Sequence, residues 1–516
     1  MTRTIGLNGG PGMDAYAGLN PYYGDIHNHC ALSYGKGRLD EALHNARLQL
    51  DFVSVTLHGH WDDMPRGEPR LDYLVDYHQR GFERAGAAWS GYLRAMDAAN
   101  REGQFLTFPS FEWHSMRYGD HCVYFRDIAT PEIFHAAHLE DLRARLRQHP
   151  HPSLLIPHHI GYRQGYRGIN WSSFTSELSP VVEIMSFHGA SESTDAEPAY
   201  LHAMGPRDHR SAAQHGLELG HIFGFVGSSD DHSAHPGNYG YGLAAVWAEA
   251  LTREAVWDAI CRRRTYALTG DRIGLQFALN GAPMGAILPY SYERNIEVVV
   301  DAAATIDTID ILCNNRVIHR EAISPGLYPG SGPCKLRLEL GWGELESLTE
   351  WDVELSLEGG QLLGVEPHLR GKDIAMPDLE EGDSCVLSDR FALDDDTVRL
   401  RTRSPRNATV RSAATQALTL HIKARPQTLV HARINGVSLA LPLAELARGA
   451  RSFYTGSFVA PAFVFHQAAP QQDWQRRVSL AHGSDGSTRD WYYARVRQRN
   501  GQWAWSSPIW VDGAAE

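Results

Sequence analysis

Two different hydrophobic patterns divide the chain near residue 270. In the first part, apolar residues recur at helical spacing from Leu39 to Leu50, and residues 51–56 then read as a strand. Residues 140–148 are again helix-like and precede an apolar run at 153–156. Strands that alternate with helices predict an α/β fold with a parallel sheet, either open or closed into a barrel.

The second part has the pattern of half-buried antiparallel strands. Short, partly alternating apolar runs occur at 296–300, 336–340, 353–357 and 418–422. Asn-Gly pairs, which favour tight hairpin turns, occur at 280–281, 435–436 and 500–501. We therefore expect two domains: residues 1–272 form the α/β part, and residues 273–516 form an antiparallel β-rich, sandwich-like part.

Composition and charge narrow the class of protein. A net charge of -13 argues against nucleic acid as a partner, because phosphate binding requires a clustered basic face. No apolar run is long enough to span a membrane, and the N-terminus lacks the layout of a signal peptide. The six cysteines form no regular framework, so we expect a reduced, cytoplasmic protein. Its oligomeric state is left open, with a homo-oligomer among the alternatives.

Histidine is concentrated in the first part, where 21 of the 27 residues precede position 240. Six apolar runs there are each followed at once by side chains that can bind metal. The six groups are Asp25, His27 and His29; His58 and His60; Glu112 and His114; His158 and His159; His188; and Asp230, Asp231 and His232. Because the C-terminal ends of parallel strands converge on one face, these groups predict a multi-metal site. Imidazole with carboxylate suits zinc, manganese or iron.

The pair His27 and His29 has its own physical reason. Residues two apart on an extended strand point the same way, so both imidazoles can reach one ion. His60 and His114 directly follow or flank candidate ligands, and we expect them to hydrogen-bond to ligands rather than to bind metal themselves.

Several motifs resemble those of the PHP (polymerase and histidinol phosphatase) superfamily. The matching segments are 24–29, 51–58, 111–112, 157–159 and 227–232, so the resemblance covers roughly residues 20 to 270. The closing segment, Trp505 to Trp510, looks like the ending of a large PHP-like group with a β-rich C-terminal part. The resemblance implies a distorted (β/α)7 barrel, similar to a TIM barrel, that holds two or three divalent ions.

The resemblance also implies a ligand set. His27, His29, Glu112 and Asp230 would hold the first ion. Glu112 would bridge to a second ion, which some of His121, His158 and His188 would complete. His58 and His232 would bind a third ion or act on the substrate. Tyr34 stands where many members have an acidic residue or histidine, so we expect two ions, with a third as the alternative.

The amidohydrolase superfamily, which also begins with a His-x-His motif, is the natural rival. Many of its two-metal members bridge their ions with a carboxylated lysine from the middle of the barrel. The only lysine before residue 335 is Lys36, which comes too early in the chain. The rival is weakened, although its glutamate-bridged and single-metal members survive.

These residues predict a hydrolase that uses a metal-activated hydroxide. A phosphoester of a small organic molecule is the first choice of substrate, with Lys36, Arg117, Arg163 and Arg167 holding its anionic group. His58, His159 or His232 would protonate the leaving group. One alternative is hydrolysis of a carbamate, ester or amide of an aromatic small molecule. Another is a non-catalytic, metal-stabilised binding protein.

Overall fold

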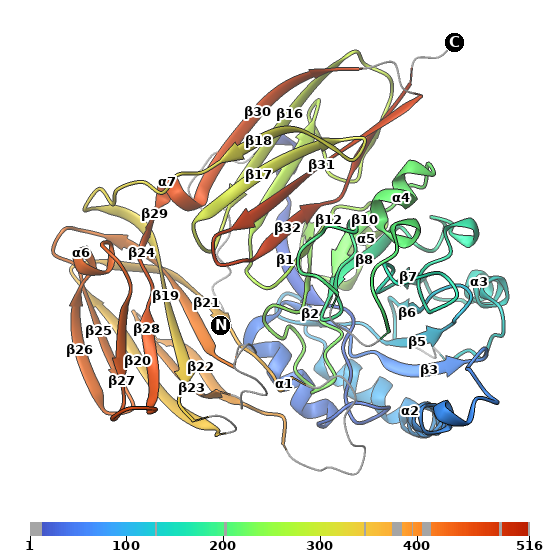
Figure 1. The fold of residues 1–516 in the computed structure, drawn as a ribbon, viewed down its shortest axis with the longest axis horizontal. Coiled ribbons are helices and arrows are strands. Elements are labelled where there is room, and N and C mark those ends of the chain that lie inside the picture. Colours follow the sequence, from blue (N-terminus) through green and yellow to red (C-terminus); the bar gives the residue numbers. More distant parts are fainter. Residues whose placement is uncertain are drawn as a thin grey trace.

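The computed structural model describes residues 13–128, 132–200, 204–344, 347–373, 384–394, 396–404, 414–484 and 488–513. The fold is mixed α/β and rich in sheet, which confirms the broad class that the sequence predicts. Figure 1 shows three regions: the helices and strands of the first part on the right, a β region above them, and a β sandwich on the left.

The described residues of the first part form five α-helices. They are α1 (Leu39–Gln49), α2 (Asp72–Ala99), α3 (Leu139–Gln148), α4 (Ala213–Glu218) and α5 (Arg253–Cys261). Helices α1 and α3 lie where the apolar spacing predicts them. Short 3-10 helices occur at Asp14–Tyr16, Pro69–Leu71, Trp171–Ser173 and His209–Ser211.

Twelve short strands accompany these helices within the described ranges. They are β1 (Asn20–Asp25), β2 (Phe52–Val53), β3 (Leu57–Trp61), β4 (Leu106–Thr107), β5 (Ser110–His114), β6 (His121–Phe125), β7 (Ser153–Pro157), β8 (Val181–Ser186), β9 (Gly189–Ala190), β10 (Gly224–Gly227), β11 (Leu243–Ala248) and β12 (Thr265–Leu268). The predicted strand at 51–56 is therefore split, with β2 and β3 on either side of residues 54–56.

These strands form three separate ladders rather than one purely parallel sheet. Strands β1, β2 and β4 pair in parallel, and β11 and β12 extend them in the antiparallel sense. Strands β3 and β5 are parallel but β6 and β7 are antiparallel, and β8 pairs in parallel with β10. The link between β5 and β6 is residues 115–120, which is too short for a crossover helix and requires a hairpin. A closed (β/α)7 barrel is not confirmed.

The sandwich consists of two antiparallel sheets, as the alternating pattern predicts. One sheet has the order β21 (Gln361–His368), β24 (Gln416–Ala424), β19 (Gly332–Trp342), β28 (Pro461–Phe465) and β27 (Arg451–Tyr454), with β29 (Ala469–Pro470) also paired to β19. The other has the order β22 (Ser388–Asp394), β23 (Thr397–Ser404), β20 (Thr349–Glu358), β25 (Leu429–Ile434) and β26 (Val437–Pro442). Leu336, Leu338, Trp351 and Val353 are buried in their shared core.

The third region joins the first part to the sandwich. Its strands are β13 (Gly274–Leu279), β14 (Ala282–Pro283), β15 (Ile287–Leu288), β16 (Glu293–Asp301), β17 (Ile306–Cys313), β18 (Arg316–Ala322), β30 (Gln475–Gly483), β31 (Arg489–Gln498), β32 (Trp503–Ser506) and β33 (Ile509–Asp512). The one-turn helices α6 (Leu443–Leu446) and α7 (Gln471–Trp474) complete the described elements.

The last strands of the chain return to the first part. Strand β32 pairs with β12, so that Tyr266 lies opposite Ser506 and Leu268 opposite Ala504. One continuous sheet thus contains strands from both sides of residue 272. The side chain of Trp505 is buried there, and its Nε1–H donates to Oε2 of Glu192 at 2.8 Å.

Two of the three Asn-Gly pairs form the expected two-residue turns. Asn280 and Asn435 adopt left-handed φ values of 49° and 46° between β13 and β14 and between β25 and β26. The third pair lies within the longer connection 499–502, where Gly501 alone of the pair is left-handed.

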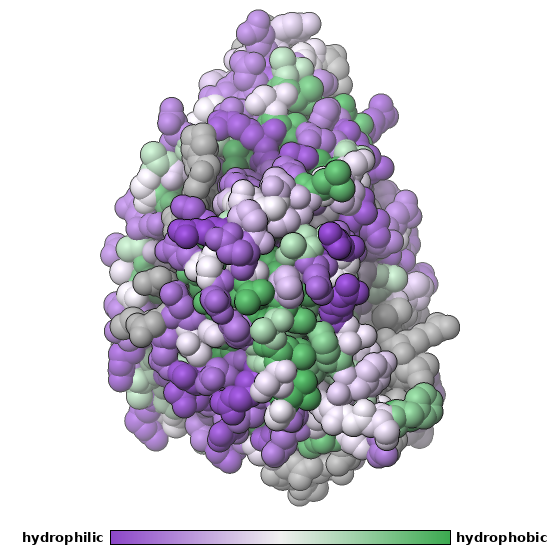
Figure 2. All heavy atoms as spheres, turned by 90° about the vertical axis from the view of Figure 1, so that its left-hand side faces the viewer, coloured by the Kyte–Doolittle hydropathy of each residue, from purple (hydrophilic) through white to green (hydrophobic). Residues whose placement is uncertain are grey.

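The remaining sequence expectations concern the surface and the cysteines. All six cysteines are free thiols. None of the helices in the described ranges is both long and apolar enough to cross a lipid bilayer. Figure 2 shows the face on which the sandwich lies, where hydrophobic residues gather in the middle among hydrophilic ones.

Candidate metal centre

The predicted ligands reach one place because the ends of several strands are tied together. Asp25, the last residue of β1, is fully buried and accepts hydrogen bonds from the backbone N–H groups of Ser229 at 3.0 Å and Gly237 at 2.7 Å. These contacts hold the loop after β10, which carries Asp230, against the His27–His29 segment after β1. Asp25 is therefore a structural carboxylate that positions two groups of ligands.

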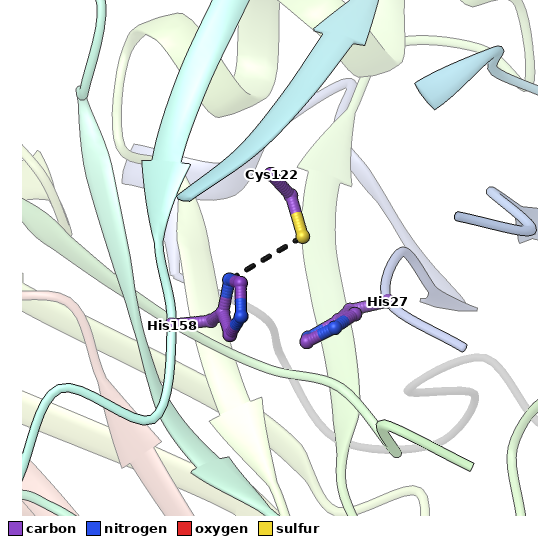
Figure 3. A group of neighbouring side chains, drawn as sticks. All are labelled: His27, Cys122 and His158. Atoms are coloured by element: carbon purple, nitrogen blue, oxygen red, sulfur yellow. Dashed lines mark hydrogen bonds between the residues drawn. The ribbon is translucent and has the colours of Figure 1, made fainter. Parts of the chain in front are cut away.

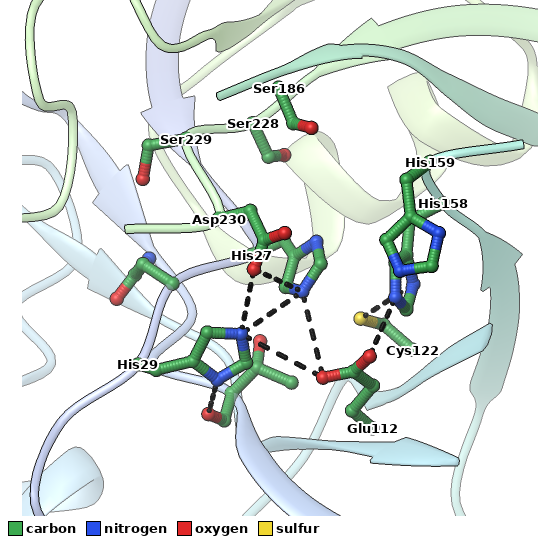
Figure 4. Close-up of polar contacts among 12 residues, drawn as sticks. His27, His29, Glu112, Cys122, His158, His159, Ser186, Ser228, Ser229 and Asp230 are labelled. Atoms are coloured by element: carbon green, nitrogen blue, oxygen red, sulfur yellow. Dashed lines mark hydrogen bonds and ion pairs between the residues drawn. The ribbon is translucent and has the colours of Figure 1, made fainter. Parts of the chain in front are cut away.

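The four side chains predicted for the first ion lie together (Figure 4). The Nε2 atoms of His27 and His29 are 3.2 Å apart, and Oδ1 of Asp230 lies 3.3 and 3.0 Å from them, respectively. Oε2 of Glu112 is 3.9 Å from Nε2 of His27 and 3.7 Å from Nε2 of His29. Two imidazole nitrogens and two carboxylate oxygens thus surround one point in a buried environment.

The second oxygen of each carboxylate faces a further histidine. Oε1 of Glu112 is 2.7 Å from Nε2 of His158 and 3.1 Å from Nδ1 of His114. Oδ2 of Asp230 is 2.8 Å from Nε2 of His188. Glu112 and Asp230 are therefore placed to bridge two adjacent ions. His114, expected only to support a ligand, belongs to a group with His58 and Glu112 that could itself hold metal.

A third group adjoins the first. His29, His58 and His232 bring three ligand atoms close enough to share an ion, and Nε2 of His58 is 3.4 Å from Oε2 of Glu112. The Tyr34 ring stacks on His58 with ring centroids 3.3 Å apart, and its hydroxyl is 3.3 Å from Nε2 of His114. Tyr34 thus fills the position beside His58 with an aromatic ring.

Five of these imidazoles share one arrangement, in which Nε2 faces the other ligands and Nδ1 contacts another protein atom. We call this set of side chains the cluster; it consists of His27, His29, His58, Glu112, His158, His188, Asp230 and His232. The Nδ1 partners are Oε2 of Glu183 for His27 (3.0 Å), the carbonyl of Thr56 for His29 (2.8 Å), Oγ of Ser33 for His58 (2.9 Å), Sγ of Cys122 for His158 (3.4 Å) and the hydroxyl of Tyr162 for His188 (2.7 Å). Such partners fix the ring orientation and leave Nε2 free to bind an ion, as in known metal sites.

The charge states of two histidines and two carboxylates of the cluster suit a cation. Burial lowers the pKa of His58 and His158 well below the usual range of histidine, so these rings are neutral and can ligate. Although burial alone raises it, His114 and His158 hold the pKa of Glu112 well below its usual range. The pKa of Asp230 is likewise held low against its burial, by His27 and His188.

His121 is not brought to the cluster, unlike the other predicted ligands. Glu112 pairs with Cys122 across β5 and β6, whereas Trp113 pairs with His121. Since neighbouring residues of a strand point to opposite faces, Cys122 faces the cluster and His121 lies on the Trp113 side. Figure 3 shows Cys122 beside His27 and His158.

A second polar network borders the cluster. Asp120 is fully buried and accepts from Nε of Arg167 at 2.6 Å, while Nε2 of His159 lies 3.2 Å from its carboxylate. The Arg167 guanidinium stacks over Trp61 at 4.9 Å. Although burial raises it, Arg167 and His114 hold the pKa of Asp120 well below its usual range. The positive charge of Arg167 is therefore paired with Asp120 inside the protein.

A cavity of about 580 Å³ opens above the cluster. His58, Glu112, His159, His188, Asp230 and His232 are among the residues that line it. Trp61, Leu71, Leu74 and Tyr77 give it an apolar wall within residues 61–78, a segment that also contributes Glu68 and Arg70, and Phe187 contributes from elsewhere. The cavity is large enough for a drug-sized molecule.

The four basic residues predicted to hold a substrate anion are dispersed. Arg167 lines the cavity, but Arg117 and Arg163 line a separate depression. Lys36 is buried and is not among the residues that line the cavity; its backbone N–H donates to the carbonyl of His232 at 2.7 Å. The structure therefore does not bring these four cations together.

Three residues of the site were not predicted as part of it. Glu183 is a single acid inside the apolar strand Val181–Ser186, and an isolated carboxylate in such a strand is a usable signal. Asp120 and Cys122 flank His121, but nothing in their local pattern distinguishes them from it.

Comparisons with known proteins give limited matches. The model of a family described as a protein of unknown function (DUF3604) matches residues 240–284, which follow the Asp230–His232 segment. An uncharacterised protein of Chlamydia pneumoniae is 28% identical over 255 residues, which cover 45% of this chain and 40% of that protein. An uncharacterised protein of Chlamydia trachomatis is 31% identical over 169 residues, covering 30% and 27% of the two chains. The chain thus matches less than half the length of these relatives.

One solved structure is similar over most of both chains. It is a two-domain protein of Bacteroides vulgatus described as containing a predicted PHP-like metal-dependent phosphoesterase. The identity is 11%, the coverage is 91% of this chain and 97% of the other, and the TM-score is 0.34. The relatives matched by sequence have no named function, so the functional argument rests on the geometry of the cluster.

Proposed function

We propose that this chain is a metal-dependent hydrolase that holds two divalent ions, with zinc, manganese and iron as the candidates. His27, His29, Asp230 and Glu112 would hold the first ion, and Glu112, Asp230, His158 and His188 the second. The observation that carries the proposal is the shared orientation of five imidazoles, each with Nε2 facing the cluster and Nδ1 engaged. His58 and His232 remain available for a third ion or for the substrate.

The bound ions would lower the pKa of a water toward neutrality and neutralise charge on a substrate oxygen. The protein supplies the proton transfer. Of the three histidines proposed for this role, His58 and His232 have Nδ1 engaged with Ser33 and with the Asp230 carbonyl. His159 differs, because Asp120 contacts its Nε2 and its buried Nδ1 has no hydrogen-bond partner in the described ranges.

This arrangement makes His159 the best candidate to protonate the leaving group. Its ring is held by Asp120 at one nitrogen, so the other can offer a proton to a substrate in the cavity. The φ of 31° at His159 is in the left-handed region, which is uncommon for residues other than glycine and occurs at functional sites.

A small-molecule phosphoester is the first proposed substrate, because two bridged ions can clamp the attacking and leaving oxygens of a phosphoryl transfer. A carbamate, ester or amide of an aromatic molecule is the second. The apolar wall at residues 61–78 supports it, as does the pairing of Arg167 with Asp120, which leaves the cavity little free positive charge. Inorganic phosphate should inhibit a phosphoesterase and leave a carbamate hydrolase largely unaffected.

The test of the proposal is metal content. Glu112→Gln should lower bound metal and turnover in elemental analysis and a substrate screen, while circular dichroism stays unchanged. Glu41→Gln, which alters a buried glutamate of the α1 capping box, is the matched control and should keep its metal. Retention of full metal and turnover by Glu112→Gln would refute the assignment. Metal without turnover on any substrate would favour a binding protein.

A further inference from the structure

A depression of about 430 Å³ adjoins the metal cavity and contains Arg117 and Arg163. Met116 lines both hollows. The loop at residues 163–167 separates them, since Arg163 borders the depression whereas Arg167 borders the cavity. The two hollows therefore share their dividing wall.

The acidic residues of the depression are already engaged. The Asp63 carboxylate accepts from the backbone N–H groups of Met116 at 2.9 Å and Arg117 at 3.0 Å, and from Trp61 Nε1–H at 2.9 Å. Its negative charge is thus directed toward the backbone of 115–117 rather than toward a guanidinium.

The other acid, Asp208, pairs with Arg210 at 3.2 Å. By contrast, neither Arg117 nor Arg163 has an ion pair or side-chain hydrogen bond within the described ranges. Each guanidinium lies instead over a neighbouring tyrosine ring, at 5.2 Å for Arg117 and 5.4 Å for Arg163. Two guanidinium groups without a direct ion pair in the described ranges therefore line one hollow, and the ring contacts restrict where they lie.

The loop between the hollows has a constrained backbone. Gly165 has a φ of +85°, and a Cβ at Gly168 would lie 1.5 Å from the carbonyl oxygen of Tyr162. A turn this tight keeps Arg163 and Arg167 on opposite sides of one narrow wall. The tight turn of the backbone therefore separates the depression, which contains Arg117 and Arg163, from the metal cavity with its apolar wall.

We propose that the depression is an anion subsite, and that the substrate of this protein carries a carboxylate, sulfonate or phosphate group remote from the bond that is cleaved. The apolar body of the substrate would lie in the cavity, and its anionic end would contact Arg117 and Arg163. The inference rests on the proposed function for its substrate, but anion binding itself requires no turnover.

The experiment compares two fluorescent probes on the full, metal-loaded chain. Anilinonaphthalene sulfonate has an apolar body and an anionic end, whereas phenylnaphthylamine has the same kind of body without the charge. Arg117→Ala/Arg163→Ala should weaken binding of the sulfonate by about tenfold and leave the neutral probe unchanged. High salt should also weaken sulfonate binding to the native protein, because the two arginines are exposed.

Arg448→Ala/Arg451→Ala removes the same charge from exposed positions of the sandwich and should leave both affinities unchanged. Equal sulfonate affinity in the native protein and the Arg117→Ala/Arg163→Ala variant would overturn the proposal. So would an equal loss in the sandwich control, a matching loss for the neutral probe, or no binding of the sulfonate to the native protein. Metal content is measured on the same samples, so failure of the metal assignment is seen separately.

Discussion

The contact between Glu183 and His27 leads to a prediction in which metal affinity and stability change in opposite directions. Glu183 is buried in β8, and its Oε2 accepts from Nδ1–H of His27 at 3.0 Å. Its Oε1 is buried without a hydrogen-bond partner in the described part of the chain, and burial raises the pKa of this carboxyl. The Glu183 carboxylate therefore lowers the stability of the metal-free protein, while it orients the ligand His27.

Glu183→Gln keeps the shape of the side chain and removes its charge. Loss of such a supporting contact typically weakens metal binding by about 10- to 100-fold, which corresponds to roughly 1.4 to 2.7 kcal/mol. Relief of a buried, partly unsatisfied carboxylate should stabilise the metal-free protein by about 1 to 3 kcal/mol. We expect a rise of a few degrees in its melting temperature.

The assay combines zinc titration against a competing chelator with calorimetry of the metal-free protein. Glu192→Gln is the matched control, because Glu192 is equally buried but accepts from Tyr493 at 2.6 Å and Trp505 at 2.8 Å. That control should lose stability and keep its metal affinity. Unchanged zinc affinity in Glu183→Gln, or a loss of stability there like that of the control, would show that the reasoning is wrong.

Three further predictions concern other parts of the molecule. His121→Asn should keep native metal content in elemental analysis, because His121 faces the Trp113 side of β6; metal loss would contradict the register argument. Trp505→Ala should lower the free energy of unfolding by about 3 to 5 kcal/mol in urea denaturation, and a change below 1 kcal/mol would argue against its packing role. Burial, followed by the charge of Asp271, raises the pKa of Glu366 from 4.5 to about 7, a change that corresponds to roughly 3 kcal/mol. The protonated carboxyl of Glu366 therefore stabilises the folded state below pH 4.5, and this contribution is lost as the pH rises through about 7. Glu366→Gln should then be more stable than the native protein at pH 8. Equal melting temperatures of the two proteins at pH 8 would refute this prediction.

Local pattern was sufficient for much of the fold and the ligand set. Leu39, Leu43 and Ala46 are buried on α1, as their helical spacing predicts. His27, His29 and Asp230 follow short buried strands, as the strand-end rule predicts, and Glu112, which lies within β5, meets them at one point. These predictions depend on the chain within a few residues of each position.

The errors arise where a long-range pairing decides the outcome. Both faces of β6 are buried, so alternation of apolar and polar residues cannot show whether His121 or Cys122 faces the cluster. Only the pairing of β6 with β5 settles it. In the same way, Arg163 and Arg167 are four residues apart but line different hollows, because the turn between them reverses the chain.

The pairing of β12 with β32 has a consequence for how the protein is made. Leu268 reaches the ribosome exit well before its partner Ala504, which is synthesised 236 residues later. At typical elongation rates this interval lasts roughly 10 to 50 s. During that time the edge of β12 lacks its native neighbour and is open to wrong pairing. The sheet that begins at β1 is therefore completed only after β32 has been synthesised.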